Sequence, residues 1–412
     1  MTDVAWIGAA LTAARPQAVA ALLRYFRNLD VAEEAFQEAC LRALKSWPLN
    51  GPPRDPAAWL IFVGRNSALD EMRRRNKPDT LPDDDVIPDG EDTESAMVEH
   101  LDSSAYQDDV LRLLFICCQP DLPATQQIAV ALRIVSGLSV QEIASAFLVS
   151  EAAMAQRITR AKRAMTESAV AFETPGPVER AARLSTVAAM IYLLFNEGYS
   201  ASGGDAHVRI PLCEEAIRLG RLLLRLFPGE SEIMGLTALM LLQHARAPAR
   251  LDENANIVLL DDQDRQLWDR ALIAEGLVLV EKAQRLAIPG TYQLQAALAA
   301  VHARAARPQD TDWSQIDQIY AVLEASQPSP VVTLNRAVAV SKVRGPAAAL
   351  QMLAPLAEPL AGYFHYFGVK GALLKELGRG DEAREAFNKA VSLARTAAEA
   401  AHTRMNLDRL NK

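Results

Sequence analysis

A constant 34-residue offset links two segments near the end of this 412-residue chain. In the first segment Ala337, Val340, Ala349, Leu353 and Leu356 stand where the second has Gly371, Leu374, Ala383, Phe387 and Ala390. Small residues lie where two helices would approach closely, and larger ones lie where the space between helices must be filled. A looser copy occupies residues 216–228. A period of this length predicts stacked helical hairpins, none of which can bury its apolar face alone.

The length and composition of the chain set the number and kind of its domains. A chain of 412 residues is too long for one ordinary core, so two to four domains are expected. Half of the residues are hydrophobic, and Ala, Leu, Glu and Arg dominate many stretches. The sequence therefore predicts an all-α globular protein. The net charge of −8 does not by itself indicate a nucleic-acid binder.

Charge is distributed unevenly along the first 170 residues. Residues 79–109 contain twelve acidic residues and no Lys or Arg, whereas residues 1–77 contain 11 basic and 8 acidic residues. Residues 111–170 are also mildly basic, with 6 basic and 4 acidic residues. Pro82, Pro88 and Gly90 fall in the acidic stretch, which therefore resembles a solvated linker.

The predicted organisation follows from these shifts in composition. We expect a helical module over residues 1–77, an acidic linker over 78–109, a second helical module over 110–172 and a helical repeat domain over 173–412. A turn at Thr174–Pro177 would separate the second module from the repeat domain.

The clearest local pattern lies between Ser139 and Glu167. Ser139 with Glu142 predicts a capping box that opens a short helix, and Ser150 is a good N-cap for the next one. An apolar stripe on that second helix consists of Met154, Ile158, Ala161 and Met165. Its opposite face carries Gln156, Thr159, Arg160 and Arg163. Such a helix behind a short turn has the form needed to enter a DNA major groove, although a solvated helical hairpin remains the alternative.

A second pattern is the predicted helix from Ala57 to Asn76, which follows a helix over Val31–Trp47 and a Pro/Gly-rich loop over Pro48–Pro56. Its first half, Trp59–Val63, is apolar on all sides and is expected to be buried. Its second half places Ala68, Leu69 and Met72 on one side, and Asn66, Asp70, Arg73 and Arg74 on the other. Arg73–Arg75 with Lys77 would neutralise several phosphates. A solvated helix end, favoured by the helix dipole, is the alternative.

These two patterns together resemble a known family. Residues 29–76, with Leu-Asp-Val-Ala-Glu-Glu-Ala-Phe-Gln-Glu-Ala and Gly-Arg-Asn-Ser-Ala-Leu-Asp-Glu-Met-Arg-Arg-Arg, resemble region 2 of extracytoplasmic-function (ECF) RNA polymerase sigma factors. Residues 137–165, with Gly-Leu-Ser-Val-Gln-Glu-Ile-Ala and Gln-Arg-Ile-Thr-Arg-Ala-Lys-Arg, resemble region 4. The remainder is similar to the long tetratricopeptide (TPR)-like extension on one branch of these factors, including Leu-Phe-Asn-Glu-Gly-Tyr-Ser at 194–200 and Asn-Arg-Ala-Val-Ala-Val at 335–340. Order and spacing agree with the family over roughly the first 170 residues.

The resemblance implies partners and residue roles. The partners would be core RNA polymerase, through its β′ clamp helices and β flap, and promoter DNA. The contacts to the clamp helices would be Glu34, Gln37, Glu38 and Leu41. The −10 element would be opened near Arg54, Asn66, Asp70, Arg73 and Arg74. The −35 element would be contacted by Gln156, Arg157, Arg160 and Arg163.

The loop before the second helix departs from the family pattern. Such loops often carry Arg, Gly and Ser, whereas this one reads Pro-Leu-Asn-Gly-Pro-Pro-Arg-Asp-Pro. The residues that touch the extruded base are therefore left open. The repeat domain is expected to offer a surface to a protein or peptide partner and to regulate the factor.

Other classes of function find little support in the sequence. The six histidines are scattered without metal-ligand spacing, and neither Gly-rich phosphate-binding motif occurs, so we expect no cofactor, no metal and no enzyme. The four cysteines form no Cys-x-x-Cys pair and are expected to be buried thiols. Without a signal peptide or membrane span, a cytoplasmic protein is expected. The competing hypothesis is a TPR-type interaction protein that sequesters a partner and keeps a vestigial DNA-binding part.

Overall fold

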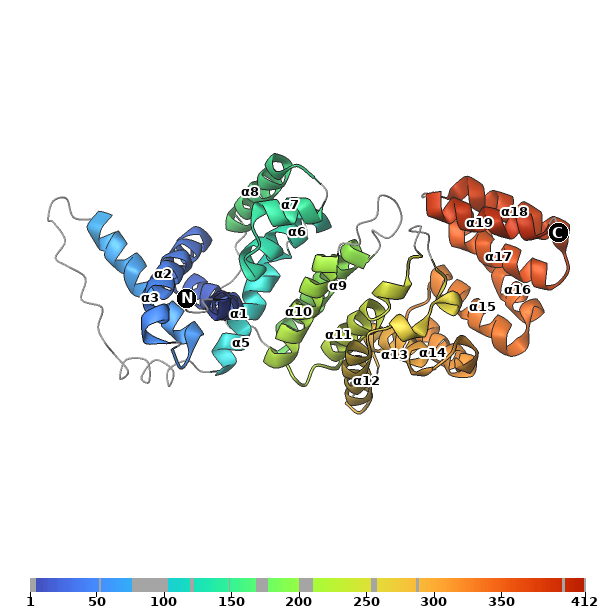
Figure 1. The fold of residues 1–412 in the computed structure, drawn as a ribbon, viewed down its shortest axis with the longest axis horizontal. Helices are drawn as coiled ribbons and strands as arrows, with labels where there is room; N and C mark the ends of the chain where they lie inside the picture. Colours follow the sequence, from blue (N-terminus) through green and yellow to red (C-terminus); the bar gives the residue numbers. More distant parts are fainter. Residues whose placement is uncertain are drawn as a thin grey trace. The chain divides into compact units, whose positions relative to one another are not determined.

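The computed structural model describes residues 5–51, 53–75, 103–118, 122–147, 149–167, 177–199, 210–252, 258–286, 289–394 and 397–410. Within these ranges the chain forms α-helices and short 3-10 or π-helical turns, with no β-strand (Figure 1). The predicted all-α fold is confirmed. The predicted linker residues 78–102, together with Lys77 and Leu148, lie outside the described residues. None of the helices in the described part of the chain is long and apolar enough to cross a membrane.

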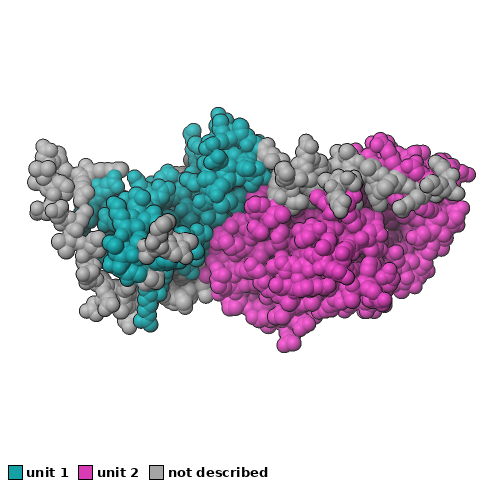
Figure 2. All heavy atoms as spheres, in the orientation of Figure 1, with its two compact units in different colours: residues 1–193 teal, residues 194–412 magenta. Residues whose placement is uncertain are grey.

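The chain divides into two compact units, residues 1–193 and residues 194–412, which are coloured separately in Figure 2. The boundary falls within α9 (Pro177–Tyr199). The first part of α9 belongs to the first unit, where the buried Arg183 lies over the ring of Phe115 at 5.2 Å. The predicted start of the C-terminal domain at residue 173 thus precedes a helix that both units share.

The first unit begins with three helices, α1 (Ala5–Phe26), α2 (Leu29–Asn50) and α3 (Pro56–Arg75), each of which packs against the other two. Asn28 caps α2 by accepting hydrogen bonds from the backbone N–H groups of Asp30 and Val31. The prediction that this helix ends at Trp47 is wrong, because Pro48 lies inside its last turn. Pro48 lacks only one helical hydrogen bond there, and the helix ends where Gly51 adopts a φ of 82°.

Helix α3 crosses α2 at Gly64, where an added Cβ would lie 2.8 Å from the carbonyl oxygen of Ala35. This close approach fixes which face of α3 is buried. Leu60 and Ile61 are buried, but Trp59, Phe62 and Val63 are only half-buried. The expectation that the whole apolar run is buried is therefore wrong, because only one face of α3 packs against the other helices of the unit.

The second half of the first unit contains α5 (Ser103–Cys117), α6 (Ala124–Ala131), the π-helical turn η1 (Leu132–Ser136), α7 (Val140–Ala146) and α8 (Glu151–Glu167). Helix α5 begins inside the stretch predicted as solvated linker, which corrects that prediction for residues 103–109. Asp109 is 4% exposed and lies 3.1 Å from Arg24 and 3.3 Å from Arg112. A buried carboxylate needs such partners. Arg112 lies three residues later on the same helix, whereas Arg24 comes from α1.

The second unit consists of helices and short helical turns. In chain order the elements after α9 are α10 (Ile210–Leu226), α11 (Ser231–His244), η2 (Ala247–Ala249), η3 (Leu260–Asp262), η4 (Arg265–Leu267), α12 (Arg270–Gln284), α13 (Thr291–Arg304), η5 (Pro308–Asp310), α14 (Trp313–Ser326), α15 (Pro330–Arg344), α16 (Pro346–Leu353), η6 (Ala354–Leu356), α17 (Phe364–Glu376), α18 (Gly380–Leu393) and α19 (Ala397–Leu410). The buried Arg265 donates to the carbonyl oxygens of His302 and Ala305 at the end of α13, at 2.8 and 2.6 Å. These carbonyls have no helical partner, so Arg265 stabilises the junction between η4 and α13.

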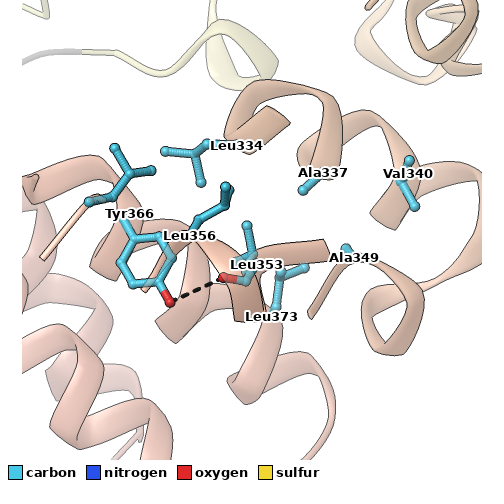
Figure 3. Close-up of a cluster of buried hydrophobic side chains, with 9 residues drawn as sticks. Leu334, Ala337, Val340, Ala349, Leu353, Leu356, Tyr366 and Leu373 are labelled. Atoms are coloured by element: carbon cyan, nitrogen blue, oxygen red, sulfur yellow. Dashed lines mark hydrogen bonds between the residues drawn. The ribbon is translucent and has the colours of Figure 1, made fainter. Parts of the chain in front are cut away.

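The 34-residue offset corresponds to two successive helical hairpins, α15 with α16 and α17 with α18. All ten residues of the repeat are buried. Leu334, Leu353, Leu356 and Tyr366 pack into one apolar cluster between the hairpins (Figure 3). The Tyr366 hydroxyl donates to the carbonyl oxygen of Leu353 at 3.4 Å, which leaves the phenol partnered inside the cluster. The predicted hairpin array is confirmed for these two copies.

The close approach of α17 and α18 at Gly371 predicts the effect of a substitution there. An added Cβ there would lie 2.7 Å from two ring carbons of the buried Phe387. Overpacking of this kind costs about 1–3 kcal/mol, against a gain in helix propensity of about 1 kcal/mol. We expect Gly371→Ala to lower the opening free energy of α17 and α18, measured by amide hydrogen exchange, by about 1 kcal/mol.

The matched control lies on the same helix, where a Cβ at Gly368 would meet nothing within 4 Å. Gly368→Ala is expected to raise the same opening free energy by about 0.5–1 kcal/mol, since only the helix propensity changes. Equal effects of the two substitutions would contradict the close approach at Gly371.

Candidate functional site

The helix-turn-helix predicted from the capping box is present in the first unit. The hydroxyl of Ser139 accepts a hydrogen bond from the backbone N–H of Glu142 at 3.1 Å. In return the Glu142 carboxylate accepts from the backbone N–H of Ser139 at 2.7 Å, and these bonds lower the pKa of Glu142. Ser150 caps α8 by accepting from the backbone N–H of Ala153 at 3.3 Å. The two caps fix where α7 and α8 begin.

Helix α8 has the two faces that its sequence predicts. The stripe of Met154, Ile158, Ala161 and Met165 is at most 5% exposed. On the other side Gln156, Thr159, Arg160 and Arg163 are exposed, whereas Arg157 is half-buried. Arg160 donates to the amide oxygen of Gln156 at 3.3 Å, so these two side chains lie together on the surface. The geometry presents guanidinium and amide groups on one helix face.

A groove of about 650 Å³ lies between α2 and α3. All four residues predicted to contact polymerase, Glu34, Gln37, Glu38 and Leu41, line this groove. Leu41 is 54% exposed and offers apolar surface within the groove. The side of the groove formed by α3 carries Ser67, Ala68, Asp70, Glu71 and Met72.

The charges in the groove favour a protein partner over nucleic acid. Four carboxylates, those of Glu34, Glu38, Asp70 and Glu71, line it beside a single guanidinium, that of Arg42. Arg42 is held by Glu38 and by the Ser67 hydroxyl, both at 3.2 Å. A phosphate backbone would be repelled here, whereas a surface with basic and apolar side chains would be complementary.

The residues predicted to act at the −10 element are distributed along α3 and the loop before it. Arg54 is exposed in the loop before α3, and Arg73 is exposed near the other end of that helix, about 28 Å away along its axis. Asn66 is half-buried between them. Asp70 lies in the acidic groove and pairs with Arg73 at 3.4 Å. The side chain of Arg74 lies outside the described residues.

Three charged residues of this unit were not singled out from the sequence. Glu33 of α2 is buried, and its carboxylate contacts Arg15 of α1 and Lys162 of α8. The available signal was the position of Glu33, which falls among the apolar residues Ala32, Ala35, Phe36 and Ala39. A charge on a buried face needs a partner, although the sequence does not reveal which.

Burial shifts the pKa of several cysteine and histidine side chains in the described residues. Burial raises the pKa of the Cys118 and Cys213 thiols to about 12, and that of Cys117 is also raised. Cys117, Cys118 and Cys213 are buried as predicted, but Cys40 is partly exposed. Burial lowers the pKa of His302 to about 4, and its ring packs edge-on against Trp313. The aromatic side chains Trp313, Tyr363, Tyr366 and Phe367 pack with the cores of the repeats.

Comparisons with protein families assign three segments of the chain. Residues 11–77 match the family described as Sigma-70 region 2, and residues 112–165 match the family described as Sigma-70, region 4. Residues 183–284 match a family of unknown function, DUF6596. The first two matches cover the three-helix module with the groove and the module with the helix-turn-helix. The third covers the end of the first unit and the beginning of the second.

A curated relative covers nearly the same length. An uncharacterized protein of Rhizobium meliloti (strain 1021) is 64% identical over 410 residues, a match that spans 100% of this chain and 97% of the relative. The whole arrangement of two sigma regions and a helical extension is therefore similar in length and sequence in that protein.

Proposed function

The chain belongs to the ECF-like sigma factors with a C-terminal extension, and we propose that it directs core RNA polymerase to promoters with defined −10 and −35 elements. As a sigma factor it acts in transcription initiation and binds DNA and core polymerase. The observation that carries the finer proposal is the presence of two chemically different surfaces in the first unit. One is the basic face of α8 and the other is the acidic, partly apolar groove between α2 and α3.

The face of α8 is suited to the −35 element. Arg160 and Arg163 can donate to guanine edges or to phosphates, and Gln156 can form paired hydrogen bonds with adenine. Arg157 is half-buried and is better placed for a phosphate at the edge of the major groove. The apolar stripe anchors this face by holding α8 against the rest of its module.

The groove is suited to the β′ clamp helices of core polymerase. Leu41 and Met72 offer apolar surface, and the carboxylates around them select a basic partner. In this proposal Asp70 acts at the polymerase side as well as near the −10 element, since it lines the groove. The β flap would then contact the region 4 module.

At the −10 element the factor would bind an extruded base. Binding energy for the unstacked base offsets the few kcal/mol lost when it is unpaired, so melting requires no chemistry. Arg54, Asn66 and Arg73 lie along one helix and its preceding loop, a length that suits several nucleotides of a single strand. Arg74 belongs to the same end of α3 as Arg73.

The C-terminal unit is proposed to be a TPR-like domain that regulates the factor. Support comes from the 34-residue period and from its hairpins α15–α16 and α17–α18. Stacked hairpins normally present an extended surface to a protein or peptide. A partner bound there would control how the first unit meets polymerase.

Arg160→Ala tests the −35 contact. If Arg160 reads a base edge, we expect a loss of about 1–3 kcal/mol in promoter binding, confined to one base position. If it contacts phosphate, the loss will be similar for all sequences, with a shallower salt dependence. Binding to duplexes with single base changes measures the difference. Lys45→Ala is the charge-matched control, since Lys45 is exposed on α2 and belongs to neither surface. Unchanged affinity and selectivity would remove Arg160 from the interface.

Gln37→Ala combined with Leu41→Ala tests the groove. We expect the affinity for core polymerase to fall by about 1–3 kcal/mol, because an exposed apolar anchor and a polar contact are lost together. Helicity, measured by circular dichroism, should stay at the wild-type value since both side chains are exposed. Leu44→Ala is the control, being 51% exposed on the same helix but outside the groove. Wild-type binding to isolated clamp helices would show that the contact surface lies elsewhere.

Removal of residues 173–412 tests the regulatory proposal. We expect promoter-dependent transcription by purified core polymerase with this variant to differ severalfold from that with the full chain, at equal folded concentration. A second variant should end at residue 193, so that the part of α9 that packs on Phe115 is kept. Equal activity of all three proteins would mean that the C-terminal unit is an independent domain. If the full chain supported no initiation, a TPR-type sequestering protein would replace the proposal.

A further inference from the structure

Three arginines of the C-terminal unit lie together near the end of α9. Arg246 and Arg250 flank η2, which packs against η4, and η4 begins with Arg265. Arg246 donates to the hydroxyl of Tyr199 at 3.0 Å. The guanidinium of Arg250 lies over the ring of Tyr199 at 3.6 Å and donates to its carbonyl oxygen at 2.9 Å. The packing therefore gathers the three guanidinium groups into one cluster.

The positive charge of this cluster is not neutralised by the surrounding side chains. In the part of the chain that the structure describes, no carboxylate lies within 4 Å of any of the three guanidinium groups. Asp261 and Asp310 act on Arg265 from farther away, but each lies closer to another cation. Asp261 lies 3.9 Å from Lys342, and Asp310 lies 2.9 Å from Arg307. Because arginine does not give up its proton, three positive charges remain together in a chain of net charge −8.

Such a cluster costs free energy in the free protein. Burial lowers the pKa of both Arg250 and Arg265, and the charge of Arg246 lowers them further. Arg265 is 4% exposed, and its Nε has no hydrogen-bond partner among the described residues. Charged groups that are both perturbed and incompletely hydrogen-bonded gather at binding sites, where a ligand offsets the cost.

The neighbouring side chain from α13 is uncharged. Burial, with the charges of Arg246 and Arg265, lowers the pKa of His302 to about 4, so its imidazole is neutral. Its Nδ1 is buried and has no hydrogen-bond partner within the described ranges. Arg246 and Arg250 are half-buried, so a small ligand can reach them from solvent. The cluster thus combines one buried guanidinium with two that solvent can reach.

The charge and burial of the cluster favour a phosphoryl dianion as its ligand. A guanidinium group is planar and binds the oxygens of phosphate or carboxylate in pairs. A phosphoryl dianion neutralises two of the three charges and offers three acceptor oxygens, whereas a carboxylate neutralises one and offers two. The phosphates of a rigid DNA duplex need exposed cations, and none of these three arginines is fully exposed.

We propose that Arg246, Arg250 and Arg265 form a binding site for a phosphoryl dianion, carried by a small molecule or by a phosphorylated side chain of a protein partner. Arg265 also donates to the carbonyl oxygens of His302 and Ala305, so a bound anion stabilises the junction of η2, η4 and α13. The use of this ligand to control transcription rests on the proposed regulatory function of the C-terminal unit. The binding site itself does not.

Inorganic phosphate tests the site in the full-length protein without polymerase or DNA. The chain has six histidines, so the imidazole signals of protein with isotope-labelled histidine are few enough to follow by NMR. The signal of His302, assigned with a His302→Gln variant, should shift with phosphate concentration and give the dissociation constant. The signal of His365, which is exposed on α17, should stay in place at constant ionic strength.

Variants of Arg246 test whether the cluster binds the anion. Arg246→Gln should weaken phosphate binding about tenfold, because one charged pair of donors is lost. Arg246→Lys keeps the charge but not the planar pair of donors, and should weaken binding about threefold. Arg285→Gln, at the other end of α12 and exposed, is the charge-matched control and should bind as the wild type does. Circular dichroism checks the helicity of each variant, and Arg246→Lys decides the question if Arg246→Gln does not fold.

Other probes define the chemistry of the ligand. Acetate at equal ionic strength should bind about tenfold more weakly than phosphate, since it carries one charge. A five-residue peptide with a central phosphoserine between alanines and glycines should bind, whereas the same peptide without phosphate should not. A higher affinity for the phosphopeptide than for inorganic phosphate would support a protein partner. Equal affinities would support a small phosphorylated molecule.

Three results would overturn the site. They are a His302 signal that moves with neither inorganic phosphate nor the phosphopeptide, equal phosphate affinity of the wild type and the Arg246 variants, and equal affinity for acetate and phosphate. The last result would replace the phosphoryl group by any small anion.

Promoter-dependent transcription separates the site from the proposed function. The phosphopeptide, added to the full chain with core polymerase, should change initiation severalfold, and Arg246→Gln should remove this change. Binding without any change in initiation would overturn the regulatory role of the site. Failure of the wild-type protein to initiate at any promoter would instead overturn the proposed function, while the NMR titration would still decide whether the anion binds.

Discussion

The buried Glu33 carboxylate is the interaction on which the arrangement of the first unit depends. It lies on the inner face of α2, and its two cations come from α1 and α8. A buried charge must be partnered, so Glu33 of α2 favours a position of α8 that brings Lys162 to it, more than a hundred residues later in the chain. Arg15 extends the same contact to the carbonyl end of η1. The modules that match sigma regions 2 and 4 are thereby held in one compact unit.

The outward surfaces of the same helices are left free for partners of opposite charge. Helix α2 turns Glu33 inward and Glu34, Gln37 and Leu41 outward into the groove. Helix α8 turns Met154 and Ile158 inward and Arg160 outward. An acidic, partly apolar groove and a basic helix face favour partner surfaces of opposite charge. This separation agrees with a factor that binds a protein on one side and DNA on another.

Patterns within a single helix predicted much of the structure. The capping box at Ser139 and Glu142 and the stripe from Met154 to Met165 are local, so periodicity and cap chemistry were enough to predict them. The exposure of Leu41 agrees with the contact role that the family resemblance implies, not with a local pattern. The same reasoning was wrong for Trp59–Val63, because three of these five residues of α3 are only half-buried. It was also wrong for residues 103–109, which are helical and include the buried Asp109. An acidic residue predicts a solvent-exposed position unless the arginines that pair with it are known.

The sequence by itself determined the class of the fold, the order of the modules, the 34-residue hairpin repeat and the two faces of α8, because each depends on neighbouring residues. Only the tertiary structure decided that Glu33, Arg15 and Lys162 meet, that Asp70 lines the groove with Glu34 and Glu38, and that Phe387 fills the space beside Gly371. These contacts join residues from different helices. Their geometry is set by how the helices cross, which local periodicity does not encode.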